Sequence, residues 1–442
     1  MAFETSASAP EIAGTRGAAF AELCFVAFLL LIFVTLKPFA IRDMSLLPLG
    51  DSGTGAGDAW RQVCYLGVFS AIALSAYMLR GARIFACMPL LLALLLGWCL
   101  ISGLWAQTPD IAFRRAGLEI VIALSAALGV QAVGPERSFT LLRYMLGAIL
   151  VVNFVSIALV HQAVHLSDES DRQLIGNWRG LYYHKNIAGA VSAITAILIF
   201  FRALDTRRTL PWLVFAAAVA FTVMTRSKTS IALLPVAVLA GVVFRASRRY
   251  TLERWIVLTA GACLAALAAT AMTFELHNIE RLISDPTELT GRVAIWQAEF
   301  SFIRDHPLLG AGFGSFADTG ALSPLYNYVA DKWVQGEAHG HNAYLQLFVT
   351  IGGVGFVLAM LALIVGPGLA FRRIDGARDV TFFAPLFAIY VFELFHNAVE
   401  SDFLEGEGPA WVAFLILLSC LQAQRNPVVE RAEVRPLRWS AP

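Results

Sequence analysis

Charged residues are scarce in this sequence. Asp, Glu, Lys and Arg make up 15% of the 442 residues, whereas soluble domains average about 25%. Hydrophobic residues make up 58%, and the mean hydropathy is +0.68. These values exclude an ordinary soluble domain and indicate an integral membrane protein. The net charge of +1 gives no basic surface for nucleic acid, so no nucleic-acid partner is expected.

Paired cysteines and a cleavable leader are also lacking. The six cysteines lie in or beside apolar runs, and none forms a CxxC or zinc-ligand spacing. We therefore expect neither a disulfide framework nor a metal site, and we assign no cofactor. The first apolar run is too long for a secretory signal and has no small-residue cleavage site, so it is predicted to be the first span.

Twelve apolar runs have the length of a membrane helix. They lie at about 18–40, 62–79, 84–105, 116–133, 139–160, 186–203, 210–225, 229–244, 253–274, 342–366, 379–397 and 409–423. The sequence thus predicts an all-α polytopic membrane protein with about 12 transmembrane helices in one integral membrane domain, 1–442. Runs seven and eight are separated only by Arg-Ser-Lys at 226–228, and they fit either two tilted helices or one interrupted pair.

The positive residues of short loops set the expected orientation. With twelve spans and both termini inside, most loop arginines fall on the cytoplasmic face, as does the tail at 424–442. These arginines are at positions 80, 83, 202, 207, 208, 245, 248, 249, 254, 372, 373 and 378, and in the tail. The opposite, periplasmic face then carries a loop at 161–185 and a large loop at 275–341, between spans nine and ten.

Five cations lie on this second face against the charge rule: Arg179, Lys185, Arg226, Lys228 and Arg292. External loops tolerate a few cations, so each of these side chains could instead be an ordinary solvated residue without a function. Arg226 and Lys228 lie between two apolar runs near membrane depth, where an ionisable side chain is a candidate for function.

The loop at 275–341 contains its own pattern. Val293, Trp296, Phe300 and Ile303 recur at helical spacing and predict an amphipathic helix that ends before Pro307. Glycines at 310, 312 and 314 follow. No strand precedes them and the spacing is wrong, which excludes a dinucleotide-binding loop. We expect a turn whose exposed N–H groups could contact a phosphate.

These residue types suit one chemistry. Arginine binds phosphate oxygens in pairs, and a lipid pyrophosphate is the obvious phosphate carrier at a membrane surface. Aromatic residues such as Trp296 either stack on sugars or anchor the chain at the interface. A histidine can accept a hydroxyl proton. Together the set suits the transfer of a glycan from a lipid pyrophosphate to a hydroxyl.

Four segments between about 175 and 405 carry a family resemblance. They read W-R-G-L-Y-Y-H-K-N-I-A-G at 178–189, T-R-S-K-T at 225–229, T-G-R-V-A-I-W at 290–296 with H-P-L-L-G-A-G-F-G-S-F after it, and E-A-H-G-H-N-A-Y at 337–344. In the last, His341-Asn342 precedes Gly352-x-x-Gly355. The sequence resembles the O-antigen ligase and Wzy-type polysaccharide polymerase family, and most closely its exopolysaccharide polymerases.

The resemblance implies a GT-C-like glycosyltransferase of the bacterial inner membrane with a periplasmic active face and no required metal. It implies an undecaprenyl-diphosphate-linked glycan as donor and an acceptor glycan, with a flippase and a chain-length regulator as candidate partners. His341 takes the position of the essential histidine, and Arg226 and Arg292 those of the diphosphate-binding arginines. Candidate substrate-binding residues are Arg179, Lys185, Asn186, Lys228, Trp296, His339, Asn342 and Glu400. His339 is an alternative base that does not fit the spacing.

Two further acidic positions have structural alternatives. Glu393 and His396 lie one helical turn apart near the outer end of span eleven. They form either a polar helix end or, with Glu400, part of a site for the acceptor. One Glu-x-x-His pair is too few ligands for a di-iron site. Glu119 in span four is expected to pair with Arg114 or Arg115.

Other functions remain open from sequence. Polymerase and O-antigen ligase differ only in the acceptor, a second lipid-linked repeat or the lipid A core. A secondary transporter shares the count of twelve spans, but the halves show no similarity and the charges crowd one face. A non-catalytic scaffold of a polysaccharide assembly complex would keep the fold without needing the arginine and histidine set.

Overall fold

The computed structural model describes residues 9–40, 59–166, 174–206, 208–246, 292–329, 340–374 and 377–425. Within these ranges the regular structure is helical, apart from one isolated bridge between Val164 and Trp178. Seven helices are long and apolar enough to cross a membrane, and four shorter apolar helices accompany them. The predicted all-α polytopic fold is confirmed.

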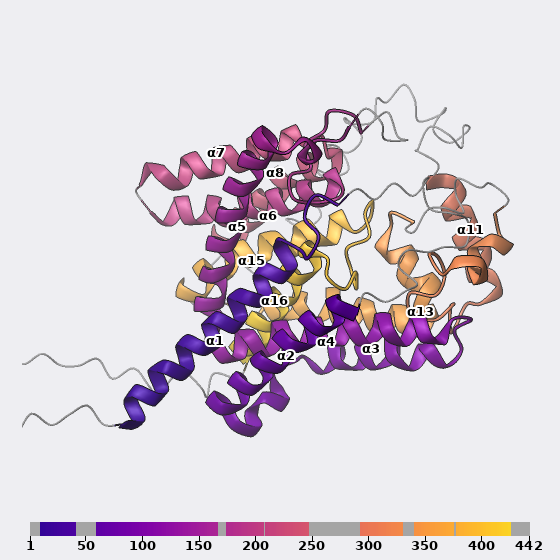
Figure 1. Cartoon of the computed structure of the whole chain (residues 1–442), viewed down its shortest axis with the longest axis horizontal. Helices are drawn as coiled ribbons and strands as arrows, with labels where there is room; N and C mark the ends of the chain where they lie inside the picture. Colours follow the sequence, from indigo (N-terminus) through magenta and orange to yellow (C-terminus); the bar gives the residue numbers. More distant parts are fainter. Residues whose placement is uncertain are drawn as a thin grey trace, which may run out of the picture.

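Eleven of the twelve predicted runs coincide with helices of the structure (Figure 1). The twelfth, at 253–274, lies outside the described residues. The helices are α1 (Ala9–Phe33), α2 (Ala59–Arg80), α3 (Leu90–Ile101), α4 (Pro109–Val133), α5 (Pro135–Leu159), α6 (Lys185–Asp205), α7 (Thr209–Met224), α8 (Lys228–Ala246), α13 (Ala343–Ala359) with its continuation through α14 (Gly366–Phe371), α15 (Ala377–His396) and α16 (Pro409–Arg425).

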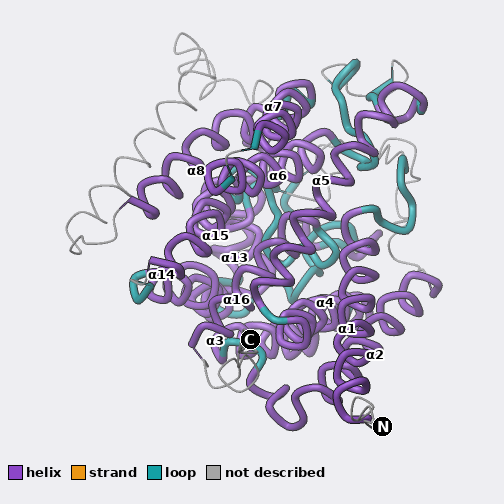
Figure 2. The backbone as a smooth tube through the Cα atoms, turned by 90° about the vertical axis from the view of Figure 1, so that its left-hand side faces the viewer, coloured by secondary structure: helices purple, strands orange, loops and turns teal. Residues whose placement is uncertain are grey.

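Helix α6 is the centre of one half of the bundle. It packs against α5, α7, α8, α15 and α16, and 78% of its apolar window is buried. Its first half reads A-G-A-V-S-A, and these small side chains let neighbouring helices approach closely. Figures 1 and 2 show α6, α7, α8 and α15 grouped together, while α1, α2 and α4 form the opposite side.

The two runs around 226–228 are separate helices. Helix α7 ends at Met224 and packs along α6, whereas α8 begins at Lys228 and packs along α15 and α6. The tight turn between them puts Arg226 in the left-handed backbone region, with φ of 53°. The alternative of two helices joined by a turn is therefore the correct one.

The segment at 292–329 forms a small second core. Helix α11 (Arg292–Asp305) confirms the predicted amphipathic helix, but its buried face differs from the predicted stripe. Phe300 is 56% exposed, whereas Ile295, Ala298 and Phe302 are buried. The error arose because the apolar side chains alone cannot give the phase of a short helix that also buries Glu299.

The glycine segment after α11 packs against the helices instead of presenting free N–H groups. The N–H of Ala311 donates to the carbonyl of Val349, that of Phe313 to Ser102 Oγ, and that of Ser315 to the carbonyl of Gly312. Arg115 donates to the carbonyl of Gly314 and to Asp318. The N–H groups of Ala311, Phe313 and Ser315 are therefore not available to a phosphate, and a phosphate contact by the rest of the turn stays a prediction.

Glu119 has different partners from those expected. Its two carboxylate oxygens accept from the Gly406 N–H at 2.7 Å and from the Trp411 indole N–H at 2.6 Å. Arg115 pairs instead with Asp318 at 3.0 Å. The predicted pairing of Glu119 with Arg114 or Arg115 is wrong, and Glu119 joins α4 to the turn before α16.

Close packing explains why residues 352 and 355 are both glycine. Helix α13 is kinked at Gly352, where φ is 67°, and a Cβ there would collide with the backbone of Leu308 and Leu309. A Cβ at Gly355 would meet the Trp98 indole, which donates to the carbonyl of Ile351. The two glycines therefore let the segment after α11 and helix α3 lie against α13, which begins two residues after His341.

We predict that Gly352→Ala destabilises the protein by at least about 2 kcal/mol, because it adds both a positive-φ strain and a backbone collision. The matched control is Gly97→Ala in α3, where an added Cβ meets no atom within 4 Å. The apparent melting temperature in detergent measures both. A Gly352→Ala protein that melts with the wild type would contradict this packing account.

Candidate functional site

His341, Glu400 and Asn186 meet at one end of the bundle. Glu400 Oε2 lies 3.2 Å from His341 Nδ1, and Glu400 Oε1 accepts from Asn186 Nδ2 at 2.7 Å. The His341 side chain is 28% exposed, whereas that of Glu400 is 9% exposed. The carboxylate thus fixes one ring nitrogen of a histidine that is still open to solvent.

Three helices begin at this end, which we call the site end: α6 at Lys185, α8 at Lys228 and α13 at Ala343. Their N-termini carry positive partial charge, which favours an anion. The α15–α16 turn lies against them, because the Ala343 N–H donates to the carbonyls of Asn397 and Glu400.

His341 itself stands on a constrained turn. Its φ is 50°, in the left-handed region, and the following residue, Asn342, caps α13 by accepting from the Leu345 N–H at 3.1 Å. Asn342 therefore fixes the direction of the chain directly after His341. Its amide oxygen serves the helix, which accounts for an asparagine at this position without a substrate contact.

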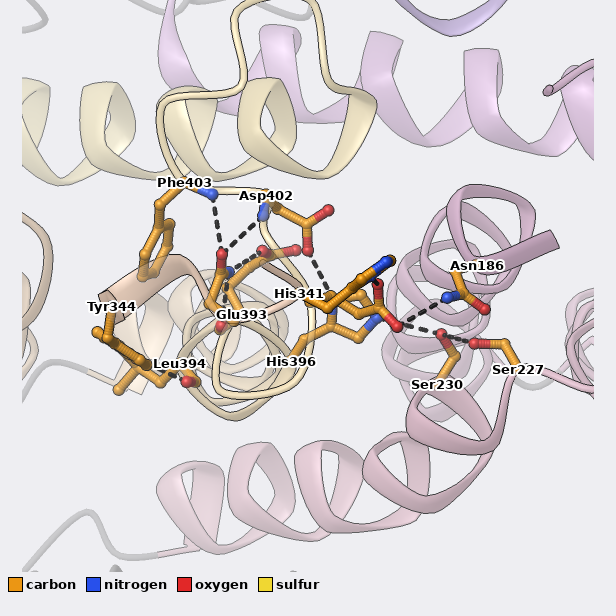
Figure 3. Close-up of polar contacts among 12 residues, drawn as sticks. Asn186, Ser227, Ser230, His341, Tyr344, Glu393, Leu394, His396, Asp402 and Phe403 are labelled. Carbon is orange, nitrogen blue, oxygen red and sulfur yellow. Dashed lines mark hydrogen bonds and ion pairs between the residues drawn. The ribbon is translucent and has the colours of Figure 1, made fainter. Parts of the chain in front are cut away.

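A buried polar cluster supports the turn that carries Glu400. His396 Nδ1 lies 2.6 Å from Asp402 Oδ2, and its Nε2 faces Ser230 Oγ at 3.4 Å. Asn397 Oδ1 accepts from the N–H groups of Asp402 and Phe403. Glu393 and His396 are 0% and 1% exposed, so this polar helix end is buried, and a role in binding the acceptor stays a prediction. The cluster joins α15 to α8 (Figure 3).

Two other histidines at the site end serve as backbone acceptors. His165 Nε2 accepts from the Lys185 N–H, and His184 Nδ1 accepts from the Asn186 N–H, each at 3.2 Å. Desolvation lowers the pKa of His184 to about 3, with repulsion from His165, His341 and Lys185 acting in the same direction. His184 is therefore neutral at physiological pH and cannot hold a substrate proton.

Helix α11 supports the chain just before His341. The Trp296 indole donates to the carbonyl of Gly340 at 2.7 Å, and a Cβ at Gly340 would collide with the Glu299 carboxyl. Glu299 is 2% exposed, and its Oε2 has no hydrogen-bond partner in the described part of the chain. Burial alone raises the pKa of Glu299 to about 8, so the carboxyl is neutral at pH 7.

The cations predicted for the site have different environments. Arg226 and Lys228 are exposed on either side of Ser227, which packs against Gly189 in the first turn of α6. Arg179 is 1% exposed and donates to the carbonyls of Gln162 and Tyr183, so in this conformation it holds its own loop together. Arg292 begins α11, four residues before Trp296.

The structure thus brings together, at the site end, Lys185, Asn186, Arg226, Lys228, His341, Asn342 and Glu400. Trp296 contacts the chain at Gly340, directly before His341. His339 lies outside the described residues. Among the described residues, no group of three or more His, Cys, Asp or Glu is arranged to hold a metal ion.

Sequence reasoning missed Glu299, Ser230 and Asp402. Glu299 lies three residues after Trp296, so a correct helical phase would have placed it on the face that meets Gly340. No sequence pattern pointed to Asp402 or Ser230. Both contact His396, which is 6 residues from Asp402 and 166 residues from Ser230.

Residues 213–360 of the chain match a family model described as O-antigen ligase. The matched segment contains most of α7 and the whole of α8, α11 and α13, and so includes Arg226, Arg292 and His341. A search of curated proteins found none that matches the chain.

We predict that Glu299→Gln flattens the dependence of stability on pH. The folded pKa of about 8 lies above the usual 4.5, so wild-type stability is fully present below 4.5 and falls as the pH rises to 8. Each pKa unit is worth about 1.4 kcal/mol. Glutamine keeps the shape without ionising and removes this loss.

Apparent melting temperatures at pH 5 and pH 8 test this. The wild type should lose more between the two pH values than Glu299→Gln does. Glu407→Gln, at a side chain that is 40% exposed and pairs with Arg61, is the control and should behave as the wild type. Parallel pH curves for wild type and Glu299→Gln would show that Glu299 is ionised at neutral pH.

Proposed function

We propose that this multi-pass membrane protein, of which residues 213–360 match a family model described as O-antigen ligase, is a glycosyltransferase that moves a lipid-diphosphate-linked glycan onto an acceptor hydroxyl. The donor is an undecaprenyl-diphosphate-linked repeat, and the acceptor is a second lipid-linked repeat, so that the product is a polysaccharide. The pair of His341 and Glu400 carries the proposal.

His341 is the base in this proposal. Glu400 occupies Nδ1 and leaves Nε2 to accept a proton from the acceptor hydroxyl, since the ring is 28% exposed. A carboxylate that orients the imidazole also stabilises the imidazolium that forms. His165 and His184 each use a ring nitrogen to accept a backbone N–H, which favours His341 over both.

The leaving group is a diphosphate, and its charge needs cations. Arg226 and Lys228 are exposed at the start of α8, and Lys185 is at the start of α6. A guanidinium can hold two phosphate oxygens at once, and the helix N-termini add to the positive potential. Arg292 is assigned to the same substrate, with Asn186, Trp296, His339 and the Nδ2 group of Asn342 as further contacts. Arg179 would join them only by releasing the carbonyls of Gln162 and Tyr183.

The proposed step is a single displacement. The acceptor oxygen forms a bond to the anomeric carbon as its proton passes to His341 Nε2. The bond between that carbon and the phosphate oxygen breaks, and its electron pair leaves with undecaprenyl diphosphate, which the cations stabilise. Attack opposite the leaving group inverts the configuration at the anomeric carbon. No redox change occurs, and no step requires a cofactor.

In this proposal the site end lies at the periplasmic face of the bacterial inner membrane, and both termini lie in the cytoplasm. The lipid donor would enter laterally from the outer leaflet after a flippase delivers it, and a chain-length regulator would act on the product. The second candidate function is ligation of the glycan to the lipid A core, favoured by the description of the matched family. It uses the same donor and leaving group.

We predict that His341→Ala abolishes glycan transfer, with at least about a 100-fold loss, because the general base is removed. A deletion strain complemented with this variant should resemble the deletion in its lipopolysaccharide and secreted polysaccharide. The matched control is His161→Ala, an exposed histidine of the loop at the same end, which should restore wild-type product. Full rescue by His341→Ala would refute the proposed base.

The product of the deletion strain separates the two candidates. Single lipid-linked repeats identify a polymerase, whereas finished polymer that stays on undecaprenyl diphosphate and never reaches the lipid A core identifies a ligase.

We further predict that Arg226→Ala lowers turnover by about 100-fold or more, because loss of a charge clamp removes several kcal/mol of transition-state stabilisation. Arg226→Lys should recover part of the activity by keeping the charge without the planar fork. Arg208→Ala at the other end of α7 is the control, since Arg208 is also exposed but lies away from the site end. Equal turnover in Arg226→Ala and Arg208→Ala would remove Arg226 from the mechanism.

A further inference from the structure

A cavity of about 370 Å³ lies at the opposite end of the bundle from His341. The starts of α5 and α15 and the end of α6 surround it, and each of these helices has its other end at the site end. The lining residues are Glu136, Phe139, Thr140, Arg143, Leu198, Phe201, Arg202, Asp205, Thr381, Phe382 and Pro385. The proposed transfer reaction gives none of them a role.

Two of these residues, Arg143 and Arg202, are cations that form no ion pair with a carboxylate in the described part of the chain, although Asp205 lies within electrostatic range of Arg143. Arg143 lies 5.8 Å from the centre of the Phe139 ring, within electrostatic range of both Arg202 and Asp205. Neither guanidinium makes a hydrogen bond or an ion pair within the described residues. Two neighbouring positive charges beside apolar walls cost free energy unless an anion joins them.

Other arginines at this end do have partners. Arg137 forms two hydrogen bonds with Glu22, at 2.8 and 2.7 Å, and Arg245 lies 2.7 Å from Asp205. Asp205 is thus neutralised by Arg245 although it lines the cavity. The lining residues together with Arg245 thus comprise three guanidinium groups, of Arg143, Arg202 and Arg245, and two carboxylates, of Glu136 and Asp205, which leaves one positive charge in excess.

The position of the cavity indicates the source of the anion. Arg143 is eight residues into α5, about 12 Å along the helix axis, and Arg202 is three residues before the end of α6. The 21-residue α6 is about as long as the hydrocarbon core of a bilayer is thick, so Arg202 lies near the headgroup boundary, and Arg143 lines the same cavity from α5. Phe139, Leu198 and Phe382 give the cavity apolar walls.

We propose that this cavity binds the phosphodiester headgroup of an anionic phospholipid, with Arg143 and Arg202 holding the phosphate oxygens. A headgroup with one net negative charge balances the excess positive charge, and the apolar walls accept its glycerol and upper acyl chain. The guanidinium fork matches the geometry of the phosphate. A free inorganic phosphate has the same recognising chemistry, but it would leave the apolar walls uncovered.

The test uses the purified, delipidated full chain in detergent, titrated with phosphatidylglycerol, phosphatidylcholine or inorganic phosphate and followed by native mass spectrometry. We expect phosphatidylglycerol to bind most tightly. The double variant Arg143→Gln/Arg202→Gln should weaken the tightest phosphatidylglycerol site by about tenfold or more. Arg137→Gln, an arginine of the same end whose side chain is 50% exposed, is the control and should bind as the wild type.

Several outcomes would overturn the proposal. Equal phosphatidylglycerol affinity in the wild type and the double variant would remove the site. Inorganic phosphate that binds alone at millimolar concentration and displaces phosphatidylglycerol would identify a free-anion site. Equal affinity for phosphatidylcholine would remove the requirement for net charge. If the double variant does not fold, Arg202→Gln alone decides, because Arg202 is exposed and has no partner whose loss would unfold the chain.

Discussion

The site depends on the carboxylate of Glu400. One of its oxygens faces His341 and the other accepts from Asn186, so a single side chain joins the start of α13 to the start of α6. Because Glu400 is almost buried, this pairing is weakly screened by solvent. The remaining contacts at the site end hold these two partners in place. The Ala343 N–H binds the carbonyl of Glu400, and the His396–Asp402 pair fixes the turn on which Glu400 lies.

The same constraint explains why small residues recur in the motif segments. Gly189 lets Ser227 lie against α6, Gly340 lets Glu299 and Trp296 lie against the chain before His341, and Gly352 lets the segment after α11 cross α13. In each case a side chain would push apart two elements that must meet at the site. The glycines therefore have packing roles, and the chemistry is left to the histidine, the carboxylates and the cations.

Hydropathy and spacing predicted much of this from the sequence. Eleven of the twelve apolar runs are helices, and the order of His341, Arg226 and Lys185 along the chain was enough to group them at one end. The phase of α11 and the environment of Arg179 were not predictable, because both depend on what distant segments place opposite them. Glu299 shows this most clearly, since a glutamate in an amphipathic helix is normally solvated, and only contact with Gly340 reveals its burial.

A double-mutant cycle on His341 and Glu400 tests the central claim most directly. Rates of polymer formation from the purified lipid-linked donor would be compared for the wild type, His341→Ala, Glu400→Gln and the double variant. If Glu400 acts by orienting His341, Glu400→Gln lowers kcat by about 10- to 100-fold, and the double variant is no slower than His341→Ala alone. Losses that simply multiply would mean that the two residues act independently, and the account would be wrong.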